Sequence, residues 1–190
     1  MRTKGYGQSA LLLLDVIDLL SDLKITYAVI GAFAASIYGA VRASLDADAI
    51  ISLAGGDTAT GDLVKRLKKM KLKITHNLGD YSDPIREVIK ILDKYGNQVD
   101  LLIGLRGFDP DAFKRSKTVK YFNYAVNIVS LEDFIAMKIF AGSPKDIGDA
   151  ATALRQSHDK IDFFLLKQLT KNYGSHATRH LESLLKTKHT

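Results

Sequence analysis

Residues 27–51 read YAVIGAFAASIYGAVRASLDADAII. The β-branched and aromatic run Ile25–Ile30 predicts a strand that ends at Gly31. The alanine-rich segment Ala32–Tyr38 predicts a short helix, and the apolar run Ala47–Leu53 predicts a second strand. A strand, a short helix and a second strand within so few residues indicate a mixed α/β core.

Two aspartates, Asp46 and Asp48, stand at the start of the second predicted strand. Alternate residues of a strand point to the same face, so both carboxylates should project together. Their mutual repulsion would favour protonation unless a cation lies between them, and Mg²⁺ prefers a few carboxylates together with phosphates and water. An Asp-x-Asp pair is a weak motif by itself, because it occurs often by chance.

A third candidate carboxylate, Asp100, lies in a predicted hairpin made of Glu87–Leu92, a turn, and Val99–Ile103. A charge inside such an apolar strand is costly unless it is paired or bound to metal. If the hairpin packs beside the second strand, Asp100 completes a cluster with Asp46 and Asp48. In the alternative interpretation, Asp46 caps a turn, Asp48 is exposed and Asp100 pairs with a lysine. Spacing alone slightly favours that alternative.

The remaining patterns complete an α/β (α+β) fold, a mixed sheet flanked by helices with a helical C-terminal region. We expect residues 1–129 to form the core and residues 130–190 to pack on it as part of one compact unit. A helix is predicted at Ser9–Leu23, with Ser9 as N-cap. The other predicted helices are Thr58–Met70, Leu131–Ala141, Pro144–Arg155, Ile161–Asn172 and His176–Lys186, with a short helix or loop at Asp109–Lys114. Further extended segments are predicted at Leu72–His76, Val119–Phe122 and Ala125–Val129.

Composition narrows the class of protein. The 190 residues include no cysteine, which excludes disulfides and thiolate ligands. No apolar run approaches the ~20 residues of a membrane span, so we expect a soluble, cytoplasmic protein without a membrane partner. The net charge is +6, and the excess of basic residues lies after residue 60. Such a balance favours phosphate-bearing partners such as nucleotides or RNA, although a solvated basic face would look the same.

The segment from Tyr27 to Ile51 resembles the signature of the DNA polymerase β-like nucleotidyltransferase superfamily, and looks closest to the minimal branch of AbiEii- and MenT-type toxins. That branch has an apolar strand, a Gly-Gly or Gly-Ser pair, a short helix, an Arg, a Ser or Thr, and Asp-x-Asp. The matching residues are Gly31, Ala32, Arg42, Ser44, Asp46 and Asp48. The family's third carboxylate stands in an apolar-Asp-apolar context, as Asp100 does here.

A second block, from Ser130 to Asp149, resembles the helical block of the same branch. There a helix carries a Lys, and the next helix starts with Arg/Lys-Asp-x-x-Asp. The matching residues are Lys138, Lys145, Asp146 and Asp149. The helix dipole alone favours acids at a helix start, so we interpret Asp149 as structural and Asp146 as a functional candidate.

The resemblance implies catalytic and metal-binding roles for Asp46, Asp48 and Asp100, with two Mg²⁺ ions, for which Mn²⁺ is a possible substitute. It also implies that the phosphates of a nucleoside triphosphate (NTP) bind at the following positions: Gly31, Ala32, Arg42, Ser44, Lys138 and Asp146. Ala32 departs from the family, because a Ser there would add a hydroxyl for the phosphates, whereas alanine offers only its backbone N–H.

Three functions remain open at this point. The first is an NTP-dependent transferase acting on RNA, tRNA or protein, as the toxin of a toxin–antitoxin pair with a cognate antitoxin. The basic run at 65–73 suits RNA, although such a run is more often only a solvated helix face. The second is a transferase for a small molecule such as an antibiotic, which predicts a deep acidic acceptor pocket. The third is a non-catalytic nucleotide-binding module.

Overall fold

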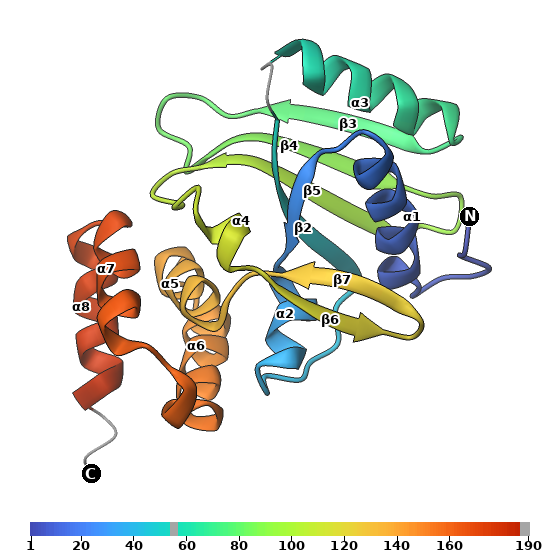
Figure 1. Ribbon diagram of the computed structural model, residues 1–190. Coiled ribbons are helices and arrows are strands. Elements are labelled where there is room, and N and C mark those ends of the chain that lie inside the picture. Colours follow the sequence, from blue (N-terminus) through green and yellow to red (C-terminus); the bar gives the residue numbers. More distant parts are fainter. Residues whose placement is uncertain (54–56, 187–190) are drawn as a thin grey trace.

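The computed structural model describes residues 1–53 and 57–186. Its strands are β1 (Thr26–Val29), β2 (Asp46–Ser52), β3 (Lys73–Leu78), β4 (Ile85–Leu92), β5 (Gln98–Leu105), β6 (Lys117–Tyr121) and β7 (Tyr124–Ile128). They form one mixed sheet in the order β3-β4-β5-β2-β1-β7-β6 (Figure 1). The central strand β2 pairs parallel with β5 and antiparallel with β1. The predicted hairpin of β4 and β5 is confirmed as an antiparallel pair.

Helices surround this sheet and form the C-terminal part of the chain (Figure 1). They are α1 (Ser9–Asp22), α2 (Gly31–Ile37), α3 (Asp57–Lys69), α4 (Ala112–Arg115), α5 (Leu131–Ala141), α6 (Pro144–Gln156), η1 (His158–Lys160), α7 (Phe163–Asn172) and α8 (Ser175–Lys186). The α/β (α+β) class predicted from the sequence is confirmed. No helix in the described ranges has the length and apolar character needed to cross a bilayer.

The two faces of the sheet differ because strand side chains alternate. On one face the side chains of β2, β4 and β5 are almost fully buried, as at Ala49, Ile89 and Leu101. Helix α1 packs against β1, β2 and β5, and α3 packs against β3. The opposite face of the same strands holds half-exposed residues, among them Asp48 and Asp100. Because the apolar residues of β2 and β5 face the buried side of the sheet, the alternating aspartates face the opposite, more accessible side.

The helical region begins where the sequence predicts, because capping residues define its helix starts. The hydroxyl of Ser130 accepts a hydrogen bond from the backbone N–H of Asp133 at the start of α5. Ser143 caps α6 in the same way, with Pro144 at the first helical position. The phenol of Tyr38, just after α2, donates to the carbonyl of Val129 at 2.6 Å. This bond ties the helical region to the strand–helix–strand segment.

One predicted cap is wrong. Ser9 is not the N-cap of α1, because Gln8 occupies that position without a side-chain bond. The Ser9 hydroxyl instead donates to the carbonyl of Leu45 at 2.5 Å and accepts from the N–H of Gln98 at 3.0 Å. Ser9 therefore connects the starts of β2 and β5, the two strands that carry the aspartates. Local helix periodicity does not reveal this long-range role.

Candidate active site

The three aspartates lie on adjacent strands and on one face of the sheet. Asp48 on β2 is the register partner of Asp100 on β5, and Asp46 is the partner of Gln98. Partners on neighbouring strands are about 5 Å apart at the backbone and point to the same side. The sequence-based expectation that the hairpin brings Asp100 beside Asp46 and Asp48 is therefore met by the strand pairing.

Neighbouring side chains hold two of the carboxylates. The Ser44 hydroxyl donates to Oδ1 of Asp46 at 2.5 Å. The side-chain amide of Gln98 donates to both oxygens of Asp100, at 3.0 and 3.1 Å. These bonds fix the orientation of Asp46 and Asp100 on the sheet face, and they identify Gln98 as a site residue that the sequence analysis missed.

Negative charge is crowded at this point of the sheet. Burial, followed by the charges of Asp46 and Asp100, raises the pKa of Asp48 to about 6, although Lys138 and Arg42 act in the opposite direction. Burial also raises the pKa of Asp100. Like charges raise one another's pKa when no cation compensates them. The ionised cluster is thus costly in the protein alone.

The donor set suits a divalent cation. All three groups are carboxylates, the ligands that Mg²⁺ and Mn²⁺ prefer, and a dication would relieve the crowding seen at Asp48. Within the described residues, no three acidic, histidine or cysteine side chains are already gathered closely enough to enclose a metal ion. In chemistry and strand position the aspartates fit such an ion, and their side chains would have to turn toward it.

Gly31 brings the backbone against Asp48. Its φ of 62° lies in the left-handed region, and a Cβ atom there would overlap the Oδ2 of Asp48. Only glycine fits both the dihedral angle and the space. The N–H of Ile30 also donates to the carbonyl of Asp48 at 2.9 Å, which fixes the start of α2 against β2.

A cluster of cations and acids lies across from the aspartates. Nζ of Lys138 on α5 is 2.6 Å from Oδ1 of Asp146 and 3.0 Å from Oδ2 of Asp149, both on α6. Nε of Arg42 is 3.3 Å from the same oxygen of Asp149. Burial works to raise the pKa of Asp146, but hydrogen bonds from Lys138 and Ser143 lower it. Asp149 is therefore the buried acid that positions both cations.

One donor in this cluster lacks a partner. Nη1 of Arg42 is buried and, within the described part of the chain, has no hydrogen-bond acceptor. A buried unsatisfied donor is costly, so an acceptor from outside the chain would stabilise it. A phosphate oxygen has the required charge and geometry.

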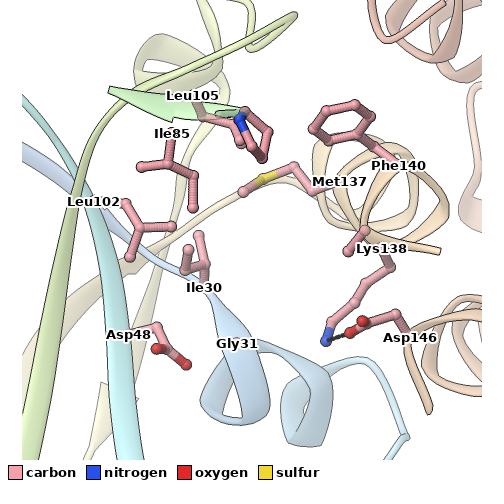
Figure 2. A pocket seen from close by; sticks show the side chains of 12 residues that line it. Ile30, Gly31, Asp48, Ile85, Leu102, Leu105, Met137, Lys138, Phe140 and Asp146 are labelled. Carbon is pink, nitrogen blue, oxygen red and sulfur yellow. Dashed lines mark hydrogen bonds and ion pairs between the residues drawn. The ribbon is translucent and has the colours of Figure 1, made fainter. Parts of the chain in front are cut away.

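A pocket of about 220 Å³ lies between this cluster and the sheet (Figure 2). Its charged residues are Asp48, Lys138 and Asp146, and Gly31 lines it with backbone atoms. Figure 2 shows Lys138 bonded to Asp146, with Asp48 and Gly31 across the pocket from them. Its other lining residues are apolar, namely Ile30, Pro84, Ile85, Leu102, Leu105, Met137, Phe140 and Ala141. The pocket is therefore apolar at one end and polar at the other.

Not every predicted site residue faces this pocket. Ala32, Arg42, Ser44 and Asp46 line a separate hollow of about 310 Å³ beside α2. Asp100 lines neither hollow and lies toward the half-exposed part of the sheet. The predicted residues thus surround two hollows. Asp48 lines the pocket, Asp46 lines the hollow beside α2, and Asp100 lies on the open part of the sheet.

Solved structures resemble this architecture over most of its length. An antigenic nucleotidyltransferase-like protein from Paracoccidioides brasiliensis superposes with a TM-score of 0.55 at 18% identity, covering 97% of this chain and 95% of that one. The chain has the nucleotidyltransferase fold. The antibiotic-resistance factor ANT(2″)-Ia gives a TM-score of 0.58 at 12% identity, covering 94% of this chain and 95% of that one. Its complex with adenylyl-2″-tobramycin gives the same score over 86% and 97%.

Sequence comparisons add no closer relative. No protein-family model matches the chain, and no curated protein matches it significantly. At these identities the structural likeness establishes the fold, and the reaction has to be argued from the site itself.

Proposed function

We propose that this protein is a metal-dependent nucleotidyltransferase, which moves a nucleoside monophosphate from an NTP to an acceptor hydroxyl and releases pyrophosphate. The observation that carries the proposal is the pairing of Asp48 with Asp100 on parallel neighbouring strands, with Asp46 on the same face. The fold and the cluster are independent arguments, since a fold alone does not define a reaction.

Asp46, Asp48 and Asp100 would hold the divalent ions, two Mg²⁺ or Mn²⁺. When bound, these ions supply charge neutralisation and lower the pKa of the acceptor hydroxyl. The hydroxyl oxygen attacks the α-phosphorus, the bond from that phosphorus to the bridging oxygen breaks, and pyrophosphate leaves. Asp100 lies at the open side of the cluster, where it can accept the hydroxyl proton.

The NTP occupies the pocket between the sheet and helices α5 and α6. Its base and sugar contact the apolar end, and its phosphates lie between Asp48 and Lys138. Lys138 neutralises phosphate charge in this pocket. Arg42, which lines the neighbouring hollow and shares Asp149 with Lys138, acts from that side through its unsatisfied Nη1. Because both the sheet and α5–α6 line the pocket, regions 1–129 and 130–190 act together in binding.

We further propose RNA, tRNA or protein as the acceptor, in the manner of the AbiEii and MenT-type toxins that the sequence resembles, with an antitoxin as partner. The alternatives are a small-molecule acceptor of antibiotic type and a non-catalytic nucleotide-binding module. An acidic acceptor pocket would favour the antibiotic type, but the side of the cluster beyond Asp100 is an open sheet face carrying Lys90.

The test is label transfer. The protein is incubated with Mg²⁺, each α-labelled NTP, and either total RNA, protein extract or aminoglycosides, with Asp48→Ala as the matched control. We expect labelled acceptor and free pyrophosphate with the wild type only. Equal labelling by Asp48→Ala would remove the catalytic assignment, and absence of transfer to every acceptor would favour the nucleotide-binding module.

A further inference from the structure

The sheet continues beyond the aspartates as an open surface. A single register row crosses four strands on this face, from Asp48 to Asp100, then Lys90, then Thr75 on the edge strand β3. The preceding row runs from Asp46 through Gln98 and Leu92 to Lys73. The side chains in each row share a face because they are register partners.

The outer half of these rows is accessible. Lys73 and Thr75 are exposed, and Lys90, Leu92 and Gln98 are half-exposed. We call these five residues the open platform. The buried residues of β4, including Ile89 and Ile91, point to the other face, and α3 packs against β3. The platform is thus a solvent-facing surface that begins at Asp100.

The platform is positively charged. In the described part of the chain, neither Lys73 nor Lys90 lies within salt-bridge distance of a carboxylate, although the charge of Lys90 acts on its register partner Asp100 and works to lower the pKa of that carboxyl. The platform residues include no acid, and one register row joins Lys90 to Asp100 of the site. A polycation such as an aminoglycoside would meet two lysines here, whereas a phosphodiester backbone would pair with them.

We propose that the open platform holds the acceptor, and that this acceptor is the end of a single-stranded RNA whose terminal hydroxyl lies beside Asp100. This inference rests on the proposed transferase function and names its substrate class. Lys73 and Lys90 bind backbone phosphates, and Leu92 gives an apolar contact to a base. An open sheet face can accept an unpaired strand, because the bases of such a strand are free to contact side chains.

Binding is measured separately from catalysis. Fluorescence anisotropy with a labelled single-stranded RNA, without NTP, gives the Kd of the wild type, of Lys73→Gln/Lys90→Gln, and of Lys167→Gln/Lys171→Gln over a range of salt concentrations. The second double variant is the matched control, since it removes the same charge from exposed positions on α7, outside the basic run at 65–73. Each lost phosphate contact on a single strand lowers the slope of log K against log salt by about 0.7.

We expect the platform variant to bind RNA more weakly than the wild type. The magnitude of its slope should be smaller by about 1.4, because two phosphate contacts are lost, while the control keeps the wild-type slope. Equal losses in both double variants, or none in the platform variant, would overturn the proposal. Transfer to a protein or an aminoglycoside that is insensitive to the platform change would also overturn it.

Transfer assays on the same variants separate this inference from the proposed function. RNA labelling that falls in the platform variant and persists in the control supports both. Undiminished RNA labelling by the platform variant contradicts the platform alone. Platform-dependent RNA binding without transfer to any acceptor contradicts the transferase and leaves the RNA surface supported.

Discussion

The covered and the open halves of one sheet face differ in how they can select a ligand. Helices α5 and α6 stand opposite the end of the sheet that holds Ile85 of β4 and Leu102 and Leu105 of β5, and they leave a pocket of about 220 Å³ lined mainly by apolar side chains. At the other end of β4, and on its neighbour β3, the same face is exposed and carries Lys90 and Lys73. Asp48 and Asp100, paired in register, lie where the two halves meet.

This difference indicates that the two substrates are recognised by different physical means. A pocket of defined size selects its ligand by shape and by a few placed polar groups. An open charged surface selects by charge, and its affinity depends on salt. The NTP is therefore assigned to the covered half and the acceptor to the open half, with the aspartates between them.

The largest effect is expected from Asp100→Asn, which removes a charge at the boundary and keeps the shape. We expect transfer to fall by about 10³-fold, the order found when a group that stabilises the transition state is removed. RNA binding by the open half should persist, because the platform lysines remain. Steady-state kinetics and anisotropy on the same preparation measure both, and normal turnover in this variant would show that Asp100 plays no part in the reaction.

Next in size is Lys138→Gln, which affects the covered half. The change leaves the carboxylates of Asp146 and Asp149 without their cation, and breaking a buried ion pair from one side costs about 4 kcal/mol. Urea unfolding gives the change in the free energy of unfolding, with Lys145→Gln, exposed in the next helix, as control. Where the variant remains folded, the KM for NTP should rise while the Kd for RNA stays unchanged; a shift in RNA affinity would contradict the division of the halves.

Asp48→Asn should stabilise the metal-free protein at neutral pH. Because the pKa of Asp48 is raised to about 6 in the folded state, its ionisation disfavours folding as pH rises between about 4 and 6. The variant lacks this penalty, so in EDTA its free energy of unfolding should exceed that of the wild type by up to about 3 kcal/mol at pH 7, with no gain near pH 3.5. Asp62→Asn, at an exposed site, is the control. An equal gain in the free energy of unfolding at both pH values would show that repulsion between the carboxylates does not destabilise the folded protein.

The smallest of these changes is Gly31→Ala. A left-handed φ costs a non-glycine residue about 1–2 kcal/mol, and the added Cβ would displace Asp48. We expect lower thermal stability and weaker NTP binding, measured by calorimetry. Gly148→Ala is the control, because that position is helical and has open space for a Cβ, so it should be neutral or slightly stabilising. Wild-type NTP affinity in Gly31→Ala would refute the close approach.

Much of this site could be predicted from local patterns. The alternation in β2 places Asp46 and Asp48 on one face, and the apolar neighbours of Asp100 define its face on β5. Counting back across the hairpin turn from Asp100 would also have identified Lys90, its partner on β4. The edge strand β3, which carries Lys73 and Thr75, completes the platform through its pairing with β4.

Other features depend on tertiary contacts that local patterns do not contain. The parallel pairing of β2 with β5 follows from how distant segments pack, because many residues separate the two strands. The same holds for Lys138 and Arg42 meeting at Asp149, where sequence spacing indicated only a favourable helix start. Side-chain rotamers, such as that of Gln98 on Asp100, likewise depend on the packed structure.

The most direct measurement is Mn²⁺ binding followed by electron paramagnetic resonance, with a non-hydrolysable NTP present, in the wild type, Asp48→Asn and Asp100→Asn. The account predicts that the wild type immobilises Mn²⁺ together with the nucleotide, and that each substitution, on its own strand, sharply weakens that binding. If both variants bind Mn²⁺ as tightly as the wild type, the two strands do not share a metal ion and the proposed reaction centre is wrong.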